Sequence, residues 1–384
     1  MMGKTIAGET AVTMSDDAAA DPAGFFPDGY VAARRAFLEA AARAGAEIDG
    51  RRHEEARAPA GEALWMDAAR IGPQRPRRML LILSGVHGVE GFCGSGVQTG
   101  TLRRLAEAAP LPPETALVMI HAVNPYGFAW LRRVNEDNVD LNRNFIDWAA
   151  GAPPTNPGYA ALRPIFCPQE WDADANLAAA DAKRAEIGER AWRAAHSGGQ
   201  YEDPAGIFYG GTGPVWSQRA LFDLLDAHVA GVERLAIVDL HTGLGPPGHG
   251  ERIAMHDPGR PAMARARAWF GGDVTSTIAG DAVTAPLSGT ALEGIERRYP
   301  AIETTAIALE FGTIDNRHVQ LAVRADNWLH GQGAARGLLD DPAGYCIKQQ
   351  IRDAFYPADP DWKRAVWRRA VATQRAMLAG LAGP

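Results

Sequence analysis

RMLLILSGVHGVEG, residues 78–91, joins a predicted buried strand to a glycine-rich polar turn. Residues 78–84 form a short, continuous apolar run, which is typical of a strand covered on both faces. The glycines that follow let the backbone fold tightly, and the three-residue offset turns His87 and Glu90 toward one point. A helix is predicted next, over residues 96–109. A strand, a turn and a helix in this order indicate an α/β arrangement.

Strand and helix patterns extend this arrangement along the chain. Buried strands are predicted over residues 116–123, 234–240 and 306–311, and residues 63–66 are predicted as an edge strand. Further helices are predicted over residues 30–46, 180–195, 217–232, 261–270, 325–338 and 346–381, the last one broken at Pro357–Pro360. Buried strands that alternate with helices predict the α/β class, as a single three-layer α/β/α domain with a mostly parallel mixed sheet.

The composition is that of a globular protein with a core of ordinary size. Of its 384 residues, 46% are hydrophobic and 22% are charged. The three cysteines, Cys93, Cys167 and Cys346, are too few and too scattered for a disulfide framework or a cysteine zinc cluster. A reducing, cytoplasmic setting is therefore expected.

Charge and hydropathy argue against two classes of partner. The formal net charge is -7, whereas proteins that bind nucleic acids normally present a basic face. No apolar stretch approaches the length that spans a bilayer, and the N-terminus lacks the apolar core of a secretory signal. We expect no nucleic-acid and no membrane partner. Residues 1–24 are predicted as a disordered lead-in, and residues 25–384 as one domain with a helical C-terminal segment.

Polar residues gather where the predicted core strands end. His87 and Glu90 follow the first strand, His241 follows the third within VDLHTG, and Glu310 closes the fourth within ALEFGT. Open α/β sheets place their sites at the carboxyl ends of strands, so these side chains are expected to converge. Catalytic zinc takes three protein ligands from His, Asp and Glu. Each match alone fits a polar loop or a rim histidine, but together they predict a metal site.

Four segments, in this order, resemble the successive signatures of the zinc carboxypeptidase superfamily. They are SGVHGVEG, NPYGFAWLRRVNEDNVDLNRNF, VDLHTG and ALEFGT, and the resemblance covers roughly residues 80–313. That superfamily contains carboxypeptidase A-like peptidases and aspartoacylase-like deacylases, and the pattern is most similar to a bacterial branch of it. The resemblance implies a zinc carboxypeptidase-like catalytic domain with one Zn²⁺ ion, held by His87, Glu90 and His241.

The resemblance also implies roles for four residues of the second segment. Asp140 matches the position that orients the first zinc histidine from behind, a role that zinc chemistry requires in any case. Arg133 resembles the arginine that polarises the scissile carbonyl and stabilises the oxyanion; its choice over Arg132 rests on the R-x-N spacing alone. Asn142 and Arg143 resemble the pair that binds the terminal carboxylate of the substrate, for which the planar fork of arginine is suited.

Glu310 is a carboxylate within an apolar strand. Burial raises the pKa of a carboxylate and makes it a better proton shuttle near neutral pH. By resemblance, Glu310 is the general base that activates the metal-bound water. The expected function is a zinc-dependent hydrolase, metallocarboxypeptidase-like, that cleaves an amide bond next to a free carboxylate. The expected substrate is a small peptide or an N-acyl amino acid.

Several alternatives stay open at this point. The chain fits an N-acyl-amino-acid deacylase of the aspartoacylase type, or a catalytically silent relative that binds carboxylates. Peptidases of the superfamily usually cover the substrate with a tyrosine from a mobile loop, and Tyr201, Tyr209 and Tyr299 are equal candidates. His249 and His256 follow the His241 segment and either touch the substrate or lie on the surface. The sequence does not determine the substrate side chain or the oligomeric state.

Overall fold

The computed structural model describes residues 22–107 and 110–383. Most of the predicted lead-in, residues 1–24, therefore lies outside the described residues. The described chain opens with a 3₁₀ helix, η1 (Pro22–Phe25), and continues into α1 (Tyr30–Arg43). Within these described ranges, no helix is long and apolar enough to cross a membrane.

The centre of the fold is an eight-stranded mixed sheet with the order β1-β2-β4-β3-β5-β8-β6-β7. Its four inner strands β4, β3, β5 and β8 run parallel; β2 pairs antiparallel with both β1 and β4, β6 pairs antiparallel with β8, and β7 pairs parallel with β6. The strands are β1 (Glu47–Arg57), β2 (Ala63–Ile71), β3 (Arg78–Ser84), β4 (Thr115–His121), β5 (Arg234–Gly243), β6 (Gly250–Ala254), β7 (Thr275–Ser276) and β8 (Glu303–Gly312). The α/β class and the mixed sheet with a parallel centre are as predicted.

The edge of the sheet differs from the prediction. Residues 63–66 belong to β2, which lies between β1 and β4, so its prediction as an edge strand is wrong. The true edge strand, β1, has the sequence EIDGRRHEEAR, and only His53 within it is buried. A strand this polar on both faces lacks the alternation of apolar and polar residues that marks a half-buried strand.

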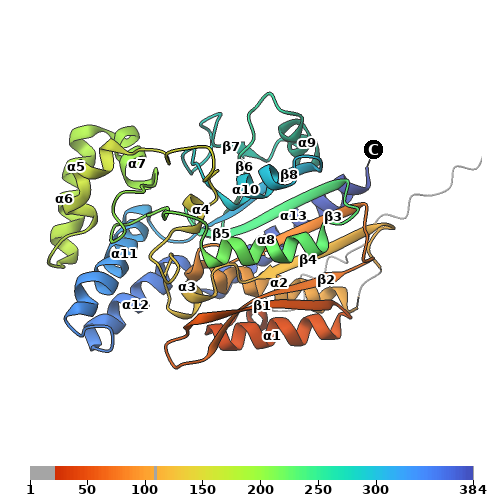
Figure 1. Cartoon of the computed structure of the whole chain (residues 1–384), viewed down its shortest axis with the longest axis horizontal. Coiled ribbons are helices and arrows are strands. Elements are labelled where there is room, and N and C mark those ends of the chain that lie inside the picture. The colour runs from red at the N-terminus through yellow and green to blue at the C-terminus, as the bar shows by residue number, and fades with distance from the viewer. Residues whose placement is uncertain (1–21, 108–109, 384) are drawn as a thin grey trace, which may run out of the picture.

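Helices cover both faces of the sheet, which makes three layers (Figure 1). One face packs against α1, α2 (Gly91–Leu105), α9 (Pro261–Phe270) and α13 (Pro360–Ala382). The other face packs against α8 (Trp216–His228) and α10 (Ala291–Arg298). Each layer contributes one apolar cluster, because alternate residues of the inner strands point to opposite faces.

A separate group of helices lies beside the sheet rather than on its faces (Figure 1). It contains α5 (Pro157–Phe166), α6 (Ala173–Ile187), α7 (Glu189–Ser197), α11 (Asn316–Trp328), the π-helical turn η3 (Leu329–Gly333) and α12 (Pro342–Phe355). The helices of this group share an apolar cluster with Val89 of the short helix η2 (Gly88–Glu90), which follows β3. Two further short helices, α3 (Pro125–Ala129) and α4 (Leu141–Asn144), follow β4.

Helix boundaries depart from the prediction where glycine is involved. The predicted helix over residues 180–195 is two helices, α6 and α7, separated at Gly188, whose φ is 84°. The helix predicted to begin at residue 96 begins at Gly91, because its glycines pack closely against other groups instead of ending the helix. A Cβ on Gly94, for example, would lie 2.4 Å from the Cβ of Ser84 on β3.

Candidate metal centre

The turn after β3 carries His87 and Glu90 and is pressed against α3. The nitrogen of Gly88 donates to the carbonyl of Arg133 at 3.1 Å. A Cβ on Gly88 would lie 2.0 Å from the carbonyl carbon of Gly127, so this close approach requires glycine. The turn is thereby held in place by backbone contacts, and it presents the two polar side chains in a fixed direction.

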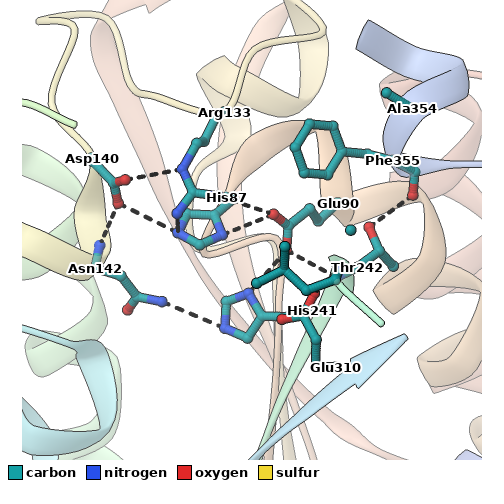
Figure 2. A network of polar contacts seen from close by, with 12 residues as sticks. His87, Glu90, Arg133, Asp140, Asn142, His241, Thr242, Glu310, Ala354 and Phe355 are labelled. Atoms are coloured by element: carbon teal, nitrogen blue, oxygen red, sulfur yellow. Dashed lines mark hydrogen bonds and ion pairs between the residues drawn. The ribbon is translucent and has the colours of Figure 1, made fainter. Parts of the chain in front are cut away.

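The carboxylate of Glu90 lies between two imidazole rings (Figure 2). Its Oε1 is 2.9 Å from Nδ1 of His87, and its Oε2 is 2.9 Å from Nδ1 of His241 on β5. Each of the three residues offers one ligand atom, and these atoms all lie within 4.8 Å of one another. The backbone nitrogen of Thr242 donates to the same Oε2 at 3.1 Å. The three predicted metal ligands therefore meet, and this group could hold a metal ion.

The outer nitrogen of each imidazole faces a buried carboxylate. Nε2 of His87 is 3.3 Å from Oδ1 of Asp140, and Nε2 of His241 is 2.7 Å from Oδ2 of Asp239. The structure thus places Asp140 behind the first histidine, where the sequence analysis expected it. Asp239 was not predicted, although its spacing gave a signal: in a strand, residues two apart point to the same face, so the Asp of VDLH lies beside the His.

The charges of this cluster shift its pKa values in opposite directions. Burial would raise the pKa of Glu90, but the two histidines outweigh it and leave that pKa below its usual value. Burial would lower the pKa of His241, but Asp239 and Glu90 hold it well above its usual value. The pKa of Asp140 is held well below its usual value because nearby Arg133 outweighs the effect of burial.

Glu310 lies beside the three convergent residues. It is the register partner of His241 on the neighbouring parallel strand β8. The backbone nitrogen of Leu244 donates to its Oε1 at 3.0 Å. Burial, assisted by the negative charge of Glu90, raises the pKa of Glu310 to about 7. A carboxyl group with this pKa can both accept and release a proton near neutral pH.

The two neighbouring arginines point to different places. Arg133 donates from Nε to Oδ2 of Asp140 at 2.9 Å, and its Nη2 is 2.7 Å from Nε2 of His87. Arg132 instead bonds Asp326 at 3.1 Å, on the other side of the loop. The structure thus places Arg133, and not Arg132, beside the convergent residues.

Asn142 and Arg143 both lie in the pocket wall, with part of their polar groups already bonded. Oδ1 of Asn142 accepts the N–H of Ala291 at 2.9 Å, and its Nδ2 is 3.5 Å from Nε2 of His241. Arg143 is buried and donates to the carbonyls of Asn142 and Ser197, while its Nε has no hydrogen-bond partner in the part of the chain that the structure describes. Burial lowers the pKa of Arg143.

The predicted site residues other than Asp140 line one pocket, together with side chains that the sequence motifs do not include. Its apolar wall contains Phe208, Leu244, Met255, Val283, Leu287, Val319, Val323 and Phe355, and its additional polar residues are Arg193, His196, Ser197, Thr284, Asn316 and Gln320. Of these, Phe208 packs against both arginines: its ring centroid lies 5.1 Å from Cζ of Arg133 and 5.6 Å from Cζ of Arg143. The pocket is therefore cationic and aromatic at one end and mainly apolar beyond it.

None of the three candidate tyrosines lines this pocket. The hydroxyl of Tyr201 donates to the carbonyl of Arg143 at 2.6 Å, and that of Tyr299 donates to Asp226 at 2.7 Å. Tyr209 lines a different pocket. Its neighbour in the chain, Phe208, lines the pocket that contains the predicted metal ligands. His249 and His256 do not line the pocket either.

The donor set and the charge balance of the centre both fit a divalent cation. Two imidazoles and one carboxylate are a ligand set of catalytic zinc. The charged groups around them are four carboxylates and two guanidinium groups, a balance of -2 when all six are ionised and both imidazoles are neutral, as metal ligands must be: Glu90, Asp140, Asp239 and Glu310 against Arg133 and Arg143. Buried charge of one sign is costly unless it is compensated, and a divalent cation between the imidazoles would compensate it.

Comparisons with known proteins identify a family whose model covers most of this chain. The profile of a family described as "Protein of unknown function (DUF2817)" matches residues 26–369. A comparison with curated proteins gave no match.

Among solved structures, similar ones include bovine thrombin-activatable fibrinolysis inhibitor in complex with tick carboxypeptidase inhibitor, with 11% identity and a TM-score of 0.48 over 94% of this chain and 99% of that chain. Carboxypeptidase A from Helicoverpa armigera has 12% identity and a TM-score of 0.46 over 85% and 74% of the two chains. A metallo-carboxypeptidase from Pseudomonas aeruginosa, in complex with (2-guanidinoethylmercapto)succinic acid, has 15% identity and a TM-score of 0.43 over 93% and 71%. These likenesses concern the fold alone.

Proposed function

Because the chain belongs to the DUF2817 family, whose description assigns no activity, we propose its function from the site itself: a zinc-dependent hydrolase that cleaves an amide bond next to a free carboxylate. The observation that carries the proposal is the position of Glu90 between Nδ1 of His87 and Nδ1 of His241, with Glu310 on the adjacent strand. Ligands and a proton acceptor side by side are the parts that metal-assisted hydrolysis needs.

His87, Glu90 and His241 would hold the ion. When bound, zinc supplies a Lewis acid that polarises a carbonyl oxygen and lowers the pKa of water. The three ligands come from two elements that backbone contacts hold together, since the N–H of Thr242 donates to Glu90. Little rearrangement is then needed to form the site, which favours tight binding.

Glu310 would move the proton. Its Oε1 is held by the N–H of Leu244, so the carboxylate is fixed in direction. The other oxygen, Oε2, accepts a proton from the attacking water and passes it to the departing amine. The raised pKa of Glu310, about 7, suits both transfers because neither protonation state is strongly favoured.

The arginines would bind the substrate. Arg143, buried beside Phe208, receives the free carboxylate of the substrate at the cationic end of the pocket. Arg133 carries a permanent charge and would stabilise the negative charge that develops on the carbonyl oxygen. The rest of the substrate would extend along the apolar wall that contains Val319 and Phe355.

Metal analysis combined with a substrate panel tests this proposal. The purified protein should contain about one zinc per chain, and a chelator should abolish hydrolysis of carboxylate-bearing dipeptides or N-acyl amino acids. Added zinc should restore it. The same panel separates a peptidase, which favours dipeptides, from a deacylase, which favours N-acyl amino acids. A protein that binds zinc but hydrolyses neither class would be a binding protein, and one that binds no zinc would refute the proposal.

A further inference from the structure

Asp239 is a buried carboxylate whose polar partner is His241. It is 1% exposed, and its Oδ2 lies 2.7 Å from Nε2 of His241. Its other oxygen, Oδ1, has no hydrogen-bond partner within residues 22–107 and 110–383. Its register partners on the two neighbouring strands are Leu83 and Ala308, both apolar and buried. A carboxylate in such surroundings costs free energy unless its one contact compensates, so the contact with His241 is what keeps it there.

A second group competes for the same ring nitrogen. Nδ2 of Asn142 lies 3.5 Å from Nε2 of His241. The orientation of this amide is set by the N–H of Ala291, which donates to its Oδ1, so an N–H₂ group faces the imidazole. Asn142 can therefore only donate to Nε2, which would place the ring proton on Nδ1. An ionised Asp239 can only accept from Nε2, which in the neutral ring leaves Nδ1 free of a proton.

The distances decide between these two partners. A charge-assisted contact of 2.7 Å is about twice as strong as a neutral hydrogen bond, and 3.5 Å is at the outer limit for an amide donor. Asp239 thus outweighs Asn142 and keeps the proton on Nε2 of His241. Without a metal ion, Nδ1 can also carry a proton and donate to Oε2 of Glu90 at 2.9 Å; once that proton is lost, the tautomer with the proton on Nε2 presents the lone pair of Nδ1 to the point where Glu90 and His87 converge.

We propose that Asp239 is the positioning residue of His241: it fixes the ring orientation and the tautomer in which Nδ1 binds the metal. This inference rests on the proposed function. The centre then contains two carboxylate–imidazole pairs of the same kind, Asp140 with His87 and Asp239 with His241. Outer partners of this kind change metal affinity by roughly 10- to 100-fold when they are removed.

Zinc affinity, measured by competition with a chelating dye, is the test. Asp239→Asn keeps the shape and one acceptor oxygen but removes the charge, and we expect zinc to bind roughly tenfold more weakly. Asp239→Leu removes the acceptor, leaves Asn142 as the remaining polar neighbour, and should weaken zinc binding toward a hundredfold. Asp140→Asn is the comparator on the other histidine and should also weaken binding.

Asp67→Asn provides the matched control. Asp67 is another buried carboxylate of the same sheet, on β2, and it pairs with Arg34 at 2.7 Å, away from the centre. This variant should keep the zinc affinity of the wild type. Denaturant unfolding of the chelated proteins separates positioning from structure: Asp239→Leu should unfold at nearly the wild-type midpoint, because leucine suits the apolar neighbours of this position.

The possible outcomes separate a failure of the proposed function from a failure of the role assigned to Asp239. Wild-type protein that binds no zinc overturns the proposed function, and this inference with it. Wild-type protein that binds zinc, with both Asp239 variants equal to the Asp67 control, overturns the inference alone. Weaker zinc binding that is fully explained by a lower unfolding midpoint of the chelated Asp239→Asn protein also overturns it, because Asp239 would then be structural.

Discussion

Nη2 of Arg133 lies 2.7 Å from Nε2 of His87, the same nitrogen that Oδ1 of Asp140 approaches to 3.3 Å. A guanidinium group only donates hydrogen bonds, so in this contact Nε2 must accept and the ring proton must lie on Nδ1. A metal ion at Nδ1 requires the opposite tautomer, with Nε2 donating to Asp140. Arg133 and a metal ion therefore favour different states of His87.

We predict that zinc binding displaces Arg133 from His87. Arg133→Met removes both the competing donor and a nearby positive charge, so zinc should bind at least as tightly as in the wild type. Turnover should fall by roughly 10²–10³-fold, because the oxyanion loses its arginine. Dye competition and steady-state kinetics measure the two effects. Weaker zinc binding in this variant would contradict the assigned competition.

Glu310→Gln separates metal binding from proton transfer. The amide keeps the shape of the side chain and an oxygen for the N–H of Leu244, but it cannot accept the proton of water. Turnover should fall roughly 10²–10⁴-fold while the zinc content stays at the wild-type level. Glu296→Gln, at a half-buried carboxylate outside the pocket, is the control and should leave turnover unchanged. Retained turnover in Glu310→Gln would refute its role as the base.

Arg143 should determine the preference for a free carboxylate. We compare kcat/KM for an acid substrate and for its C-terminal amide, since a folding defect lowers both values and leaves their ratio unchanged. Arg143→Met should reduce the ratio of acid to amide by roughly 10- to 100-fold, because the charge-assisted bonds to the carboxylate are lost. Arg143→Lys keeps the charge without the planar fork, so its ratio of acid to amide should lie between those of the wild type and Arg143→Met. An unchanged ratio would exclude Arg143 from the carboxylate site.

Asp326, Arg132 and Lys348 form an ion cluster away from the metal centre. We expect the loss of Asp326 to lower the free energy of unfolding more than the loss of an exposed ion pair does. Asp326 pairs with Arg132 at 3.1 Å and also with Lys348, and its side chain is 4% exposed. Asp326→Ala leaves both cations buried without their partner, so the free energy of unfolding should fall by about 3–5 kcal/mol in urea. Asp226→Ala breaks an exposed pair with Arg298 and should cost about 1 kcal/mol or less. Equal effects would contradict the burial argument.

The same carboxylate should make stability depend on acid pH. Burial would raise the pKa of Asp326, but Lys348 and Arg132 bring it down to about 2. A lowered pKa stabilises the folded state above the unfolded pKa, near 4, and this stabilisation is lost as the pH falls toward 2. The loss should be about 2 kcal/mol across this interval. Asp326→Asn should show a flatter dependence over the same interval, and an identical dependence would contradict the shift.

The central strands could be predicted because their apolar runs are continuous. Residues 78–84 were predicted as a strand and form β3 with the same bounds. The edge strand β1 could not be predicted, because its sequence EIDGRRHEEAR carries charged residues instead of an alternating apolar pattern. Some helix starts could not be predicted from the apolar pattern. Helix α11 begins at Asn316, nine residues before the predicted start, and its first turn is exposed.

The convergence of the site could be inferred from strand ends alone, since His241 and Glu310 are register partners on adjacent parallel strands. Sequence spacing does not show which loops pack against each other to form the pocket wall. Phe208 and His196 lie far along the chain from the motifs, and they reach the pocket because α7 and the following loop fold back over it. The two-residue spacing of Asp239 and His241 within a strand contains the signal for Asp239, but the apolar run around Asp239 predicts only a strand.

Gly88 also limits how this protein can be altered. A side chain there would collide with the backbone of Gly127, and one on Gly91 would lie 2.7 Å from the ring of Phe128. The two ligands His87 and Glu90 are therefore carried by a turn whose other positions have almost no freedom to vary. Efforts to change the pocket by mutation should leave this turn untouched and diversify the wall at Val283 and Leu287.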